Sequence, residues 1–130
     1  MATRFQLKPG QRLRKNADFL ATRDAGKVYR CQYFILFANI RPDTSADVLH
    51  SRIGISASRK VGNAVERNKA KRRFKEVFRL QQHTIRPEAD LLLSIRPGAK
   101  KATYQELEQR FLHALKYTSM QRSRKQRNES

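Results

Sequence analysis

The sequence contains no tryptophan, one cysteine and few acidic residues, and each shortage narrows the classes of protein to consider. Because Cys31 is alone, no disulfide can form within the chain, which suits a reducing compartment; we expect the protein to act in the cytoplasm. The longest apolar run, residues 33–38, is far shorter than the ~20 residues needed to cross a bilayer. Residues 1–16 lack the apolar core of a secretory signal, so we expect neither secretion nor a transit signal.

Positive charge dominates the residues that are present. The 130 residues include 29 Lys and Arg against 11 Asp and Glu, which gives a formal net charge of +18. Such a chain repels itself, and a polyanionic partner is the simplest reason to tolerate this repulsion. Nucleic acid is the leading candidate, and an anionic membrane, the weaker one, is not expected as a partner. Hydrophobic residues make up 38% of the chain, which is still typical of a folded domain.

The composition divides the chain into a single domain with two basic flanks. We expect a basic N-terminal arm over residues 1–15, a domain over residues 16–118, and a basic, flexible tail over residues 119–130. Asn16 is a candidate N-cap for a short helix that ends near residue 23. Residues 28–40 are apolar on both alternating faces, which predicts a strand buried on both sides and central in its sheet.

Two further strands and two further helices complete the predicted α/β fold, a small α+β sandwich. Residues 52–58 and 90–96 are predicted strands. In the first strand apolar residues alternate with Gly54, Ser56 and Ser58, so one of its two faces is unusually small and polar. Asn63 with Glu66, and Thr103 with Glu106, have the spacing of capping boxes, which open predicted helices over residues 63–82 and 103–118. The order strand, helix, strand predicts a β-α-β crossover within a small mixed sheet.

The predicted helix over residues 63–82 carries the strongest functional signal. Its cations recur every four residues and follow one side, whereas its apolar residues occupy the adjoining stripe. Like charges at this spacing destabilise an isolated helix by about 0.2–0.5 kcal/mol per pair, so we expect a binding role rather than a solvated surface, the alternative reading. The candidate residues for binding the phosphates of a nucleic acid are Arg59, Lys60, Arg67, Asn68, Lys69, Lys71, Arg72, Lys75 and Arg79.

The sequence shows no constellation of residues for chemistry carried out by the protein itself. His50, His83 and His113 lie in different segments and lack the spacing of metal ligands. No phosphate-binding loop, no GxSxG motif and no cluster of Asp and Glu that could hold two metals is present. We therefore expect no catalytic residue and no metal ligand in this chain.

Residues 52–79, RIGISASRKVGNAVERNKAKRRFKEVFR, resemble the protein subunit of bacterial ribonuclease P. The family signature is a strand ending in Ser-x-(Lys/Arg)-Lys, then Gly-Asn-Ala-Val-x-Arg-Asn-Arg-x-Lys-Arg on a helix. Residues 58–60 and 62–72 match it, except that Lys69 stands where the family usually has a second arginine, which would offer a planar bidentate fork. The resemblance extends over about residues 12–118.

The resemblance implies a fold, a partner and a division of labour. The fold would contain an unusual left-handed β-α-β crossover. One copy of the protein would bind one catalytic RNA and the single-stranded 5′ leader of precursor tRNA, and would assist the cleavage that leaves a mature tRNA 5′ end. The RNA would carry the Mg²⁺-dependent chemistry, so the protein would belong to an endoribonuclease holoenzyme without being catalytic alone.

The resemblance also implies a leader-binding cleft between the sheet and a helix, facing the cations. By position, Phe19 corresponds to an aromatic that lines this cleft, and Arg23 replaces a second aromatic one turn later. Phe34 is our candidate for the strand aromatic, with packing in the core as an equally weighted alternative. Stacking of a base on an aromatic contributes about 1–3 kcal/mol.

Two other functions remain open on the sequence alone. One is a noncatalytic RNA-binding structural protein, such as a ribosomal protein or an RNA chaperone. The other is a self-sufficient metal nuclease, which would cleave precursor tRNA without RNA. Reconstitution with the catalytic RNA distinguishes all three.

Overall fold

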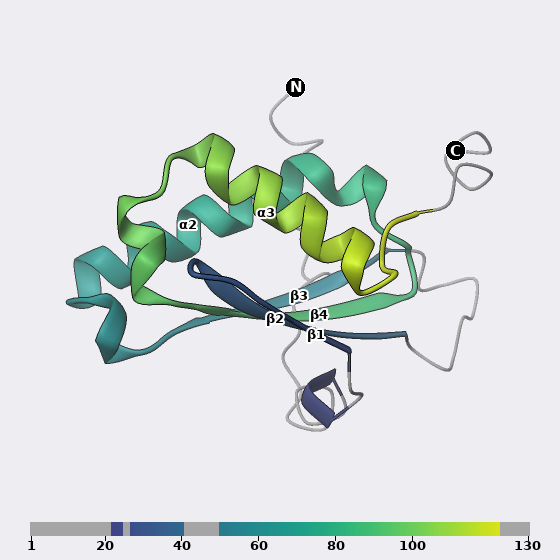
Figure 1. The fold of residues 1–130 in the computed structure, drawn as a ribbon, viewed down its shortest axis with the longest axis horizontal. Helices are drawn as coiled ribbons and strands as arrows, with labels where there is room; N and C mark the ends of the chain where they lie inside the picture. Colours follow the sequence, from purple (N-terminus) through teal and green to yellow (C-terminus); the bar gives the residue numbers. More distant parts are fainter. Residues whose placement is uncertain (1–21, 25–26, 41–49, 123–130) are drawn as a thin grey trace.

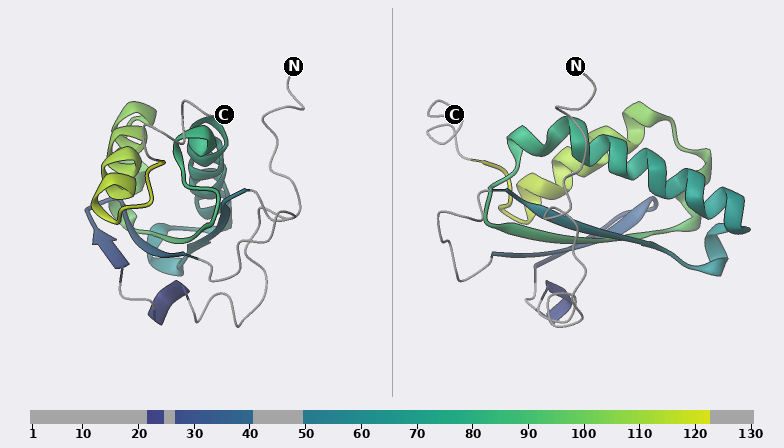
Figure 2. Two further views of the ribbon diagram at one scale, coloured as in Figure 1. Left: turned by 90° about the vertical axis from the view of Figure 1, so that its right-hand side faces the viewer. Right: turned by 180° about the vertical axis from the view of Figure 1, so that it is seen from behind.

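The computed structural model describes residues 22–24, 27–40 and 50–122, which form a sheet covered on one face by two helices (Figures 1 and 2). The strands are β1 (Lys27–Arg30), β2 (Phe34–Ile40), β3 (Arg52–Ala57) and β4 (Ala89–Ile95). The helices are α2 (Ala64–Gln81) and α3 (Tyr104–Tyr117), with short 3-10 helices η3 (Arg59–Val61), η4 (Gln82–Thr84) and η5 (Pro97–Lys101) between the elements. The predicted α/β class is confirmed. Of the predicted N-terminal helix only residues 22–24 are described, and they are helical; Asn16 and the arm lie outside the described residues.

The predicted single strand over residues 28–40 is instead a hairpin, so this prediction is wrong. β1 pairs antiparallel with β2, in a register that sets Arg30 opposite Ile35. The chain reverses at residues 31–33, where the Cys31 amide donates to the Phe34 carbonyl at 3.0 Å. Periodicity did not reveal the reversal, because both arms are apolar and no Gly or Pro marks the turn. The prediction of a central strand is confirmed for β2, which lies between β1 and β4.

The predicted β-α-β crossover is formed by β3, α2 and β4. The sheet order is β1-β2-β4-β3, with β2 antiparallel and β3 parallel to β4. In the left view of Figure 2, with the helices above the sheet, β3 runs away from the viewer and β4 lies to its left. The crossover is therefore left-handed, against the usual preference.

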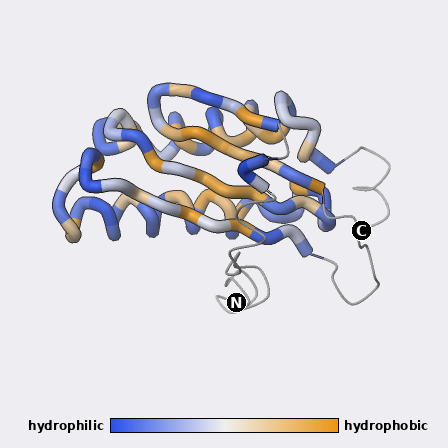
Figure 3. Tube along the Cα trace, turned by 90° about the horizontal axis from the view of Figure 1, so that it is seen from below, coloured by the Kyte–Doolittle hydropathy of each residue, from blue (hydrophilic) through white to orange (hydrophobic). Residues whose placement is uncertain are grey.

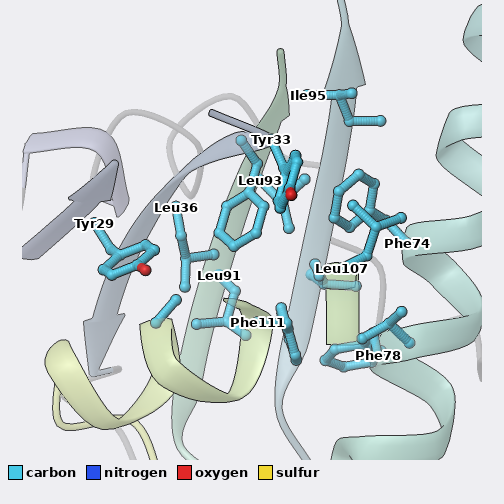
Figure 4. Close-up of a cluster of buried hydrophobic side chains, with 14 of the residues drawn as sticks. Tyr29, Tyr33, Leu36, Phe74, Phe78, Leu91, Leu93, Ile95, Leu107 and Phe111 are labelled. Atoms are coloured by element: carbon cyan, nitrogen blue, oxygen red, sulfur yellow. The ribbon is translucent and has the colours of Figure 1, made fainter. Parts of the chain in front are cut away.

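The hydrophobic core lies between the sheet and the two helices (Figure 4). Alternate residues of β2 and β4, such as Leu36 and Leu93, point toward the helices and are fully buried. On the helix side of the core, α2 contributes Phe74 and Phe78, and α3 contributes residues including Phe111. This packing holds α2 on the sheet by one side and leaves its other side to solvent.

The domain extends past its predicted boundary, so residues 119–122 do not belong to the tail. Ser119 adopts a left-handed conformation (φ 62°) after α3 and turns the chain back toward η4. Met120 is then buried at 2% exposure, and Gln121 forms an antiparallel bridge with Ile85. Burial of Met120 explains why this short segment is ordered despite its polar neighbours.

Both predicted capping boxes are present. The Asn63 side chain accepts from the Glu66 amide at 2.9 Å, and the Glu66 carboxylate accepts from the Asn63 amide at 3.0 Å. Thr103 and Glu106 make the equivalent pair at the start of α3. Gly62, at φ 150°, precedes the first box, where a Cβ atom would collide with the Glu66 carboxylate. Steric exclusion by the Glu66 side chain thus explains why glycine occupies position 62.

Acidification is expected to destabilise the domain through the second capping box. Hydrogen bonds from the Thr103 amide and the Tyr33 hydroxyl lower the pKa of the Glu106 carboxyl group. A pKa lowered in the folded state stabilises the fold above the unfolded-state value, about 4.3 for glutamate, and this contribution is lost as the pH falls through the folded value. Urea unfolding between pH 6 and 3 should show a weaker pH dependence for Glu106→Gln than for the parent chain. Parallel curves would contradict this assignment.

Candidate nucleic-acid interface

The cationic residues predicted as a binding surface lie on η3 and on the solvent side of α2. η3 follows directly from β3 and presents Arg59 and Lys60, both exposed. The capping box at Asn63 then begins α2, where Ala70 and Phe74 face the core. Because the helix is fixed by its apolar side, its cations project away from the sheet.

Most of these cations have no acidic partner. Within the described residues, no carboxylate lies within ion-pair distance of Arg59, Lys60, Arg67, Lys69, Lys71, Arg72 or Lys75. Asn68, the uncharged member of the predicted set, is exposed beside them. A surface of one charge sign with its cations unneutralised is what a polyanion requires.

Arg79 differs from the other predicted residues. Its guanidinium forms an ion pair with Glu76 one turn earlier, and its Nε donates to the Glu76 Oε2 at 3.0 Å. Its charge is therefore largely neutralised within α2, and Arg79 does not belong to the candidate surface. The neighbouring Arg73, which was not predicted, has a structural role, since it donates to the carbonyls of Ala99 and Ala102 and so fastens η5 to α2.

Arg67 combines a free charge with an unsatisfied donor. Its side chain is half-buried, and its Nε is buried without a hydrogen-bond partner. A buried donor with no acceptor costs about 1–3 kcal/mol, which an anionic ligand would recover. Arg67 is thus the strongest single candidate for a phosphate contact.

A hollow of about 140 Å³ near the start of α2 adds a cation that sequence reasoning missed. It is lined by Glu66, Lys69, Ala70, Arg73 and Lys100. The Lys100 Nζ lies 2.7 Å from the Glu66 Oε2, and this ion pair, together with the Asn63 amide, lowers the pKa of the Glu66 carboxyl group. Glu66 is the one acid among the described residues that line the hollow, and Lys100 already neutralises it. The position of Lys100 depends on η5 packing against α2, which no local pattern reveals.

A larger cavity lies on the sheet face opposite α2 and α3, the side seen in Figure 3. It measures about 290 Å³ and is lined by Arg23, Ile35, Phe37, Ser56, Leu92 and Ser94. The strand register explains the grouping, because Phe37 pairs with Leu92, and Ser94 lies between Ile35 and Ser56. The small and polar second face predicted for β3 is confirmed here. Ser56 lies on this face, and its small side chain leaves room for the cavity.

The three predicted cleft residues have different outcomes. Arg23 lines the open-face cavity. Phe34 does not: it is fully buried and packs edge-to-face on Phe74 with ring centroids 5.6 Å apart, so core packing is the correct alternative. Phe37 is the aromatic that β2 presents to the cavity, and strand alternation would have identified it once residue 34 was placed in the core. Phe19 lies outside the described residues.

The cations of α2 and the open-face cavity are two surfaces rather than the two walls of one cleft. α2 packs directly on the sheet through Phe74, Val77 and Phe78, so that no groove separates helix and sheet there. The cavity lies on the other side of the sheet, with β3 at the edge between the two surfaces. The expectation that the Arg67 side of the helix faces the aromatics across one trough is therefore wrong.

In the described part of the chain, no three His, Cys, Asp or Glu side chains come together in a way that could hold a metal ion. No helix among these residues is long and apolar enough to cross a membrane.

Comparison with known proteins identifies the family. The family model described as "Ribonuclease P" matches residues 7–119. This chain belongs to the ribonuclease P protein family. The ribonuclease P protein components of Clostridium novyi and Alkaliphilus metalliredigens are 36% and 31% identical to it over 110 residues, which span 85% of this chain and 95% of each relative.

Solved ribonuclease P proteins share the fold. The Staphylococcus aureus protein matches with a TM-score of 0.71 at 32% identity and covers 85% of this chain and 96% of its own. The Thermotoga maritima protein matches with a TM-score of 0.68 at 29% identity over 81% of this chain and 94% of its own. The chain is thus a ribonuclease P protein component, a subunit of a tRNA-processing endoribonuclease.

Proposed function

We propose that this ribonuclease P protein binds the catalytic RNA, one copy per RNA, through the cations of η3 and α2, and binds the 5′ leader of precursor tRNA in the open-face cavity. The observation that carries the proposal is the set of α2 cations, led by Arg67, that have no carboxylate partner within residues 22–24, 27–40 and 50–122; the Arg67 Nε is buried and lacks an acceptor among the same residues. The Mg²⁺-dependent cleavage chemistry is assigned to the RNA, and the protein supplies binding and positioning.

The open-face cavity has the chemistry of a single-strand site. Phe37 offers a flat surface for a base, Leu92 and Ile35 supply apolar walls, and Arg23 provides a cation for the backbone. Stacking on aromatics tolerates any base, because every base has a π-face. The two serines at the sheet offer hydrogen bonds without a fixed donor pattern. Such a site fits a leader that differs in sequence from one precursor tRNA to the next.

Reconstitution with the catalytic RNA tests the proposal directly. At limiting Mg²⁺, adding the protein should accelerate cleavage of precursor tRNA, because its cations offset phosphate repulsion in the complex. The protein should also favour a precursor with a leader of several nucleotides over one with a single leader nucleotide. Four to six contacted phosphates predict a slope of log K against log salt of about −3 to −4.

The alternatives make different predictions in the same assay. A noncatalytic RNA-binding structural protein would bind the RNA without accelerating leader removal. A self-sufficient nuclease would cleave precursor tRNA without any RNA subunit, and replacing one of its acidic residues would abolish that cleavage. Either result would overturn the proposal.

A further inference from the structure

A second basic cavity lies at the opposite end of α2 from Arg67. It measures about 150 Å³, several times the ~30 Å³ that one water molecule occupies in the liquid. Its polar lining consists of His50, Ser51, Gln82, His83 and Arg122. These residues come from the segment before β3, from η4 and from the segment after α3, so the cavity is built by tertiary packing.

The fold places Arg122 in this cavity through backbone pairing. The Arg86 amide donates to the Met120 carbonyl at 2.9 Å, and the Arg122 amide donates to the Thr84 carbonyl at 2.7 Å. Together with the buried Met120 side chain, these bonds hold the segment after α3 against η4. Arg122 is consequently presented next to His83 by an ordered backbone rather than by a loose tail.

The charges around this cavity favour an anion. The Nε of Arg122 is buried and, within the described part of the chain, has no hydrogen-bond partner; the described residues that line the cavity include no carboxylate. The acids on the adjoining segments have arginine partners of their own. The Glu88 Oε1 lies 2.7 Å from the Arg86 Nε, and the Asp90 carboxylate accepts two bonds from Arg52, at 2.8 and 2.6 Å.

We propose that this cavity binds a phosphate group of the RNA backbone, as a contact separate from the Arg67 surface. The guanidinium of Arg122, the two imidazoles and the Ser51 hydroxyl are all donors suited to phosphate oxygens. α2 spans about 27 Å from end to end, so an RNA bound along it would contact Arg67 at one end and Arg122 at the other. The phosphate source rests on the proposed function, whereas the anion site itself does not.

The three histidines of the chain allow a direct test by NMR. The imidazole signals of the full chain are followed during titration with a uridine dinucleotide phosphodiester at constant ionic strength. The His50 and His83 signals should shift saturably, because both side chains line the cavity. The His113 signal is the internal control and should stay fixed, because its Nδ1 lies 2.9 Å from the Tyr29 hydroxyl on another part of the surface. The proposed site would be refuted if none of the three imidazole signals shifted, or if all three shifted together without saturation.

Matched charge removals separate this site from general attraction. Arg122→Gln should raise the apparent Kd for the dinucleotide at least tenfold, whereas Lys116→Gln, which removes one charge from an exposed position on α3, should leave it unchanged. His83→Ala, at an exposed position, serves as a second variant if Arg122→Gln alters thermal unfolding. Equal effects of Arg122→Gln and Lys116→Gln would contradict the proposal.

Binding to the catalytic RNA then identifies the source of the phosphate. Arg122→Gln should reduce the salt slope for RNA binding by about 1, the loss expected for one phosphate contact. A dinucleotide shift combined with an unchanged RNA salt slope would refute the RNA backbone as the ligand. Neither result affects the reconstitution assay, which tests the Arg67 surface and the open-face cavity separately.

Discussion

Replacing Arg67 with alanine is expected to weaken binding of the catalytic RNA by about 10- to 100-fold. A hydrogen bond to a charged group contributes about 1.5–3 kcal/mol, and the Nε of Arg67 is a buried donor that finds no acceptor in the described part of the protein. The slope of log K against log salt should also become shallower by about 1, because one phosphate contact is lost. The measurement is a filter-binding or fluorescence titration of the RNA at several salt concentrations.

Arg79 is the matched control on the same helix. Because Glu76 already neutralises it, Arg79→Gln should change RNA affinity by less than about threefold, although it removes the same formal charge. Arg67→Lys should fall between the two, since it keeps the charge but loses the planar fork. Equal losses for Arg67→Ala and Arg79→Gln would show that net charge alone drives binding, and would contradict the assigned surface.

Replacing Phe34 with alanine is expected to destabilise the domain by about 3–5 kcal/mol. The side chain is fully buried between the sheet and α2, where it contacts Phe74, and truncation would remove its packing and leave a cavity. The free energy of unfolding of native proteins is only about 5–15 kcal/mol, so this loss is a large fraction of the stability of the domain. Urea unfolding followed by circular dichroism measures the change.

Phe37 lies three residues along the same strand, and its side chain points to the other face. Phe37→Ala should cost less than half as much stability, because the ring is only half-buried on the open face. It should instead weaken binding of leader-containing precursor by up to about 3 kcal/mol, with binding of leaderless tRNA unchanged. A Phe37→Ala protein that unfolds like Phe34→Ala, and recognises the leader normally, would refute the assignment of the two faces.

The left-handed crossover determines where the two proposed RNA-binding surfaces lie. It sets α2 above the edge strand β3, so that the cations follow the border of the sheet rather than its centre. The open face then remains available on the other side, with β3 between the surfaces. A leader held by Phe37 and a catalytic RNA held by Arg67 could therefore be bound at the same time.

Local patterns in the sequence were sufficient for the helices and for two of the strands. Capping boxes at Asn63 and Thr103 depend on contacts three residues apart, and both formed as predicted. The amphipathic pattern of α2 correctly separated Phe74 and Phe78 from the cations, because a helix buries whatever stripe is apolar. The family signature over residues 52–79 is equally local, and the family it indicated is confirmed.

Tertiary structure alone decided which side chains meet. The turn at residues 31–33 set the register of β2, which places Phe34 in the core and Phe37 on the open face, since successive side chains of a strand point to opposite faces. The pairing of Arg79 with Glu76, the approach of Lys100 to Glu66, and the return of Arg122 to His83 depend on rotamers or on contacts between distant segments. Sequence spacing determines which residues share one element, but the charge that remains free to bind RNA depends on how those elements pack.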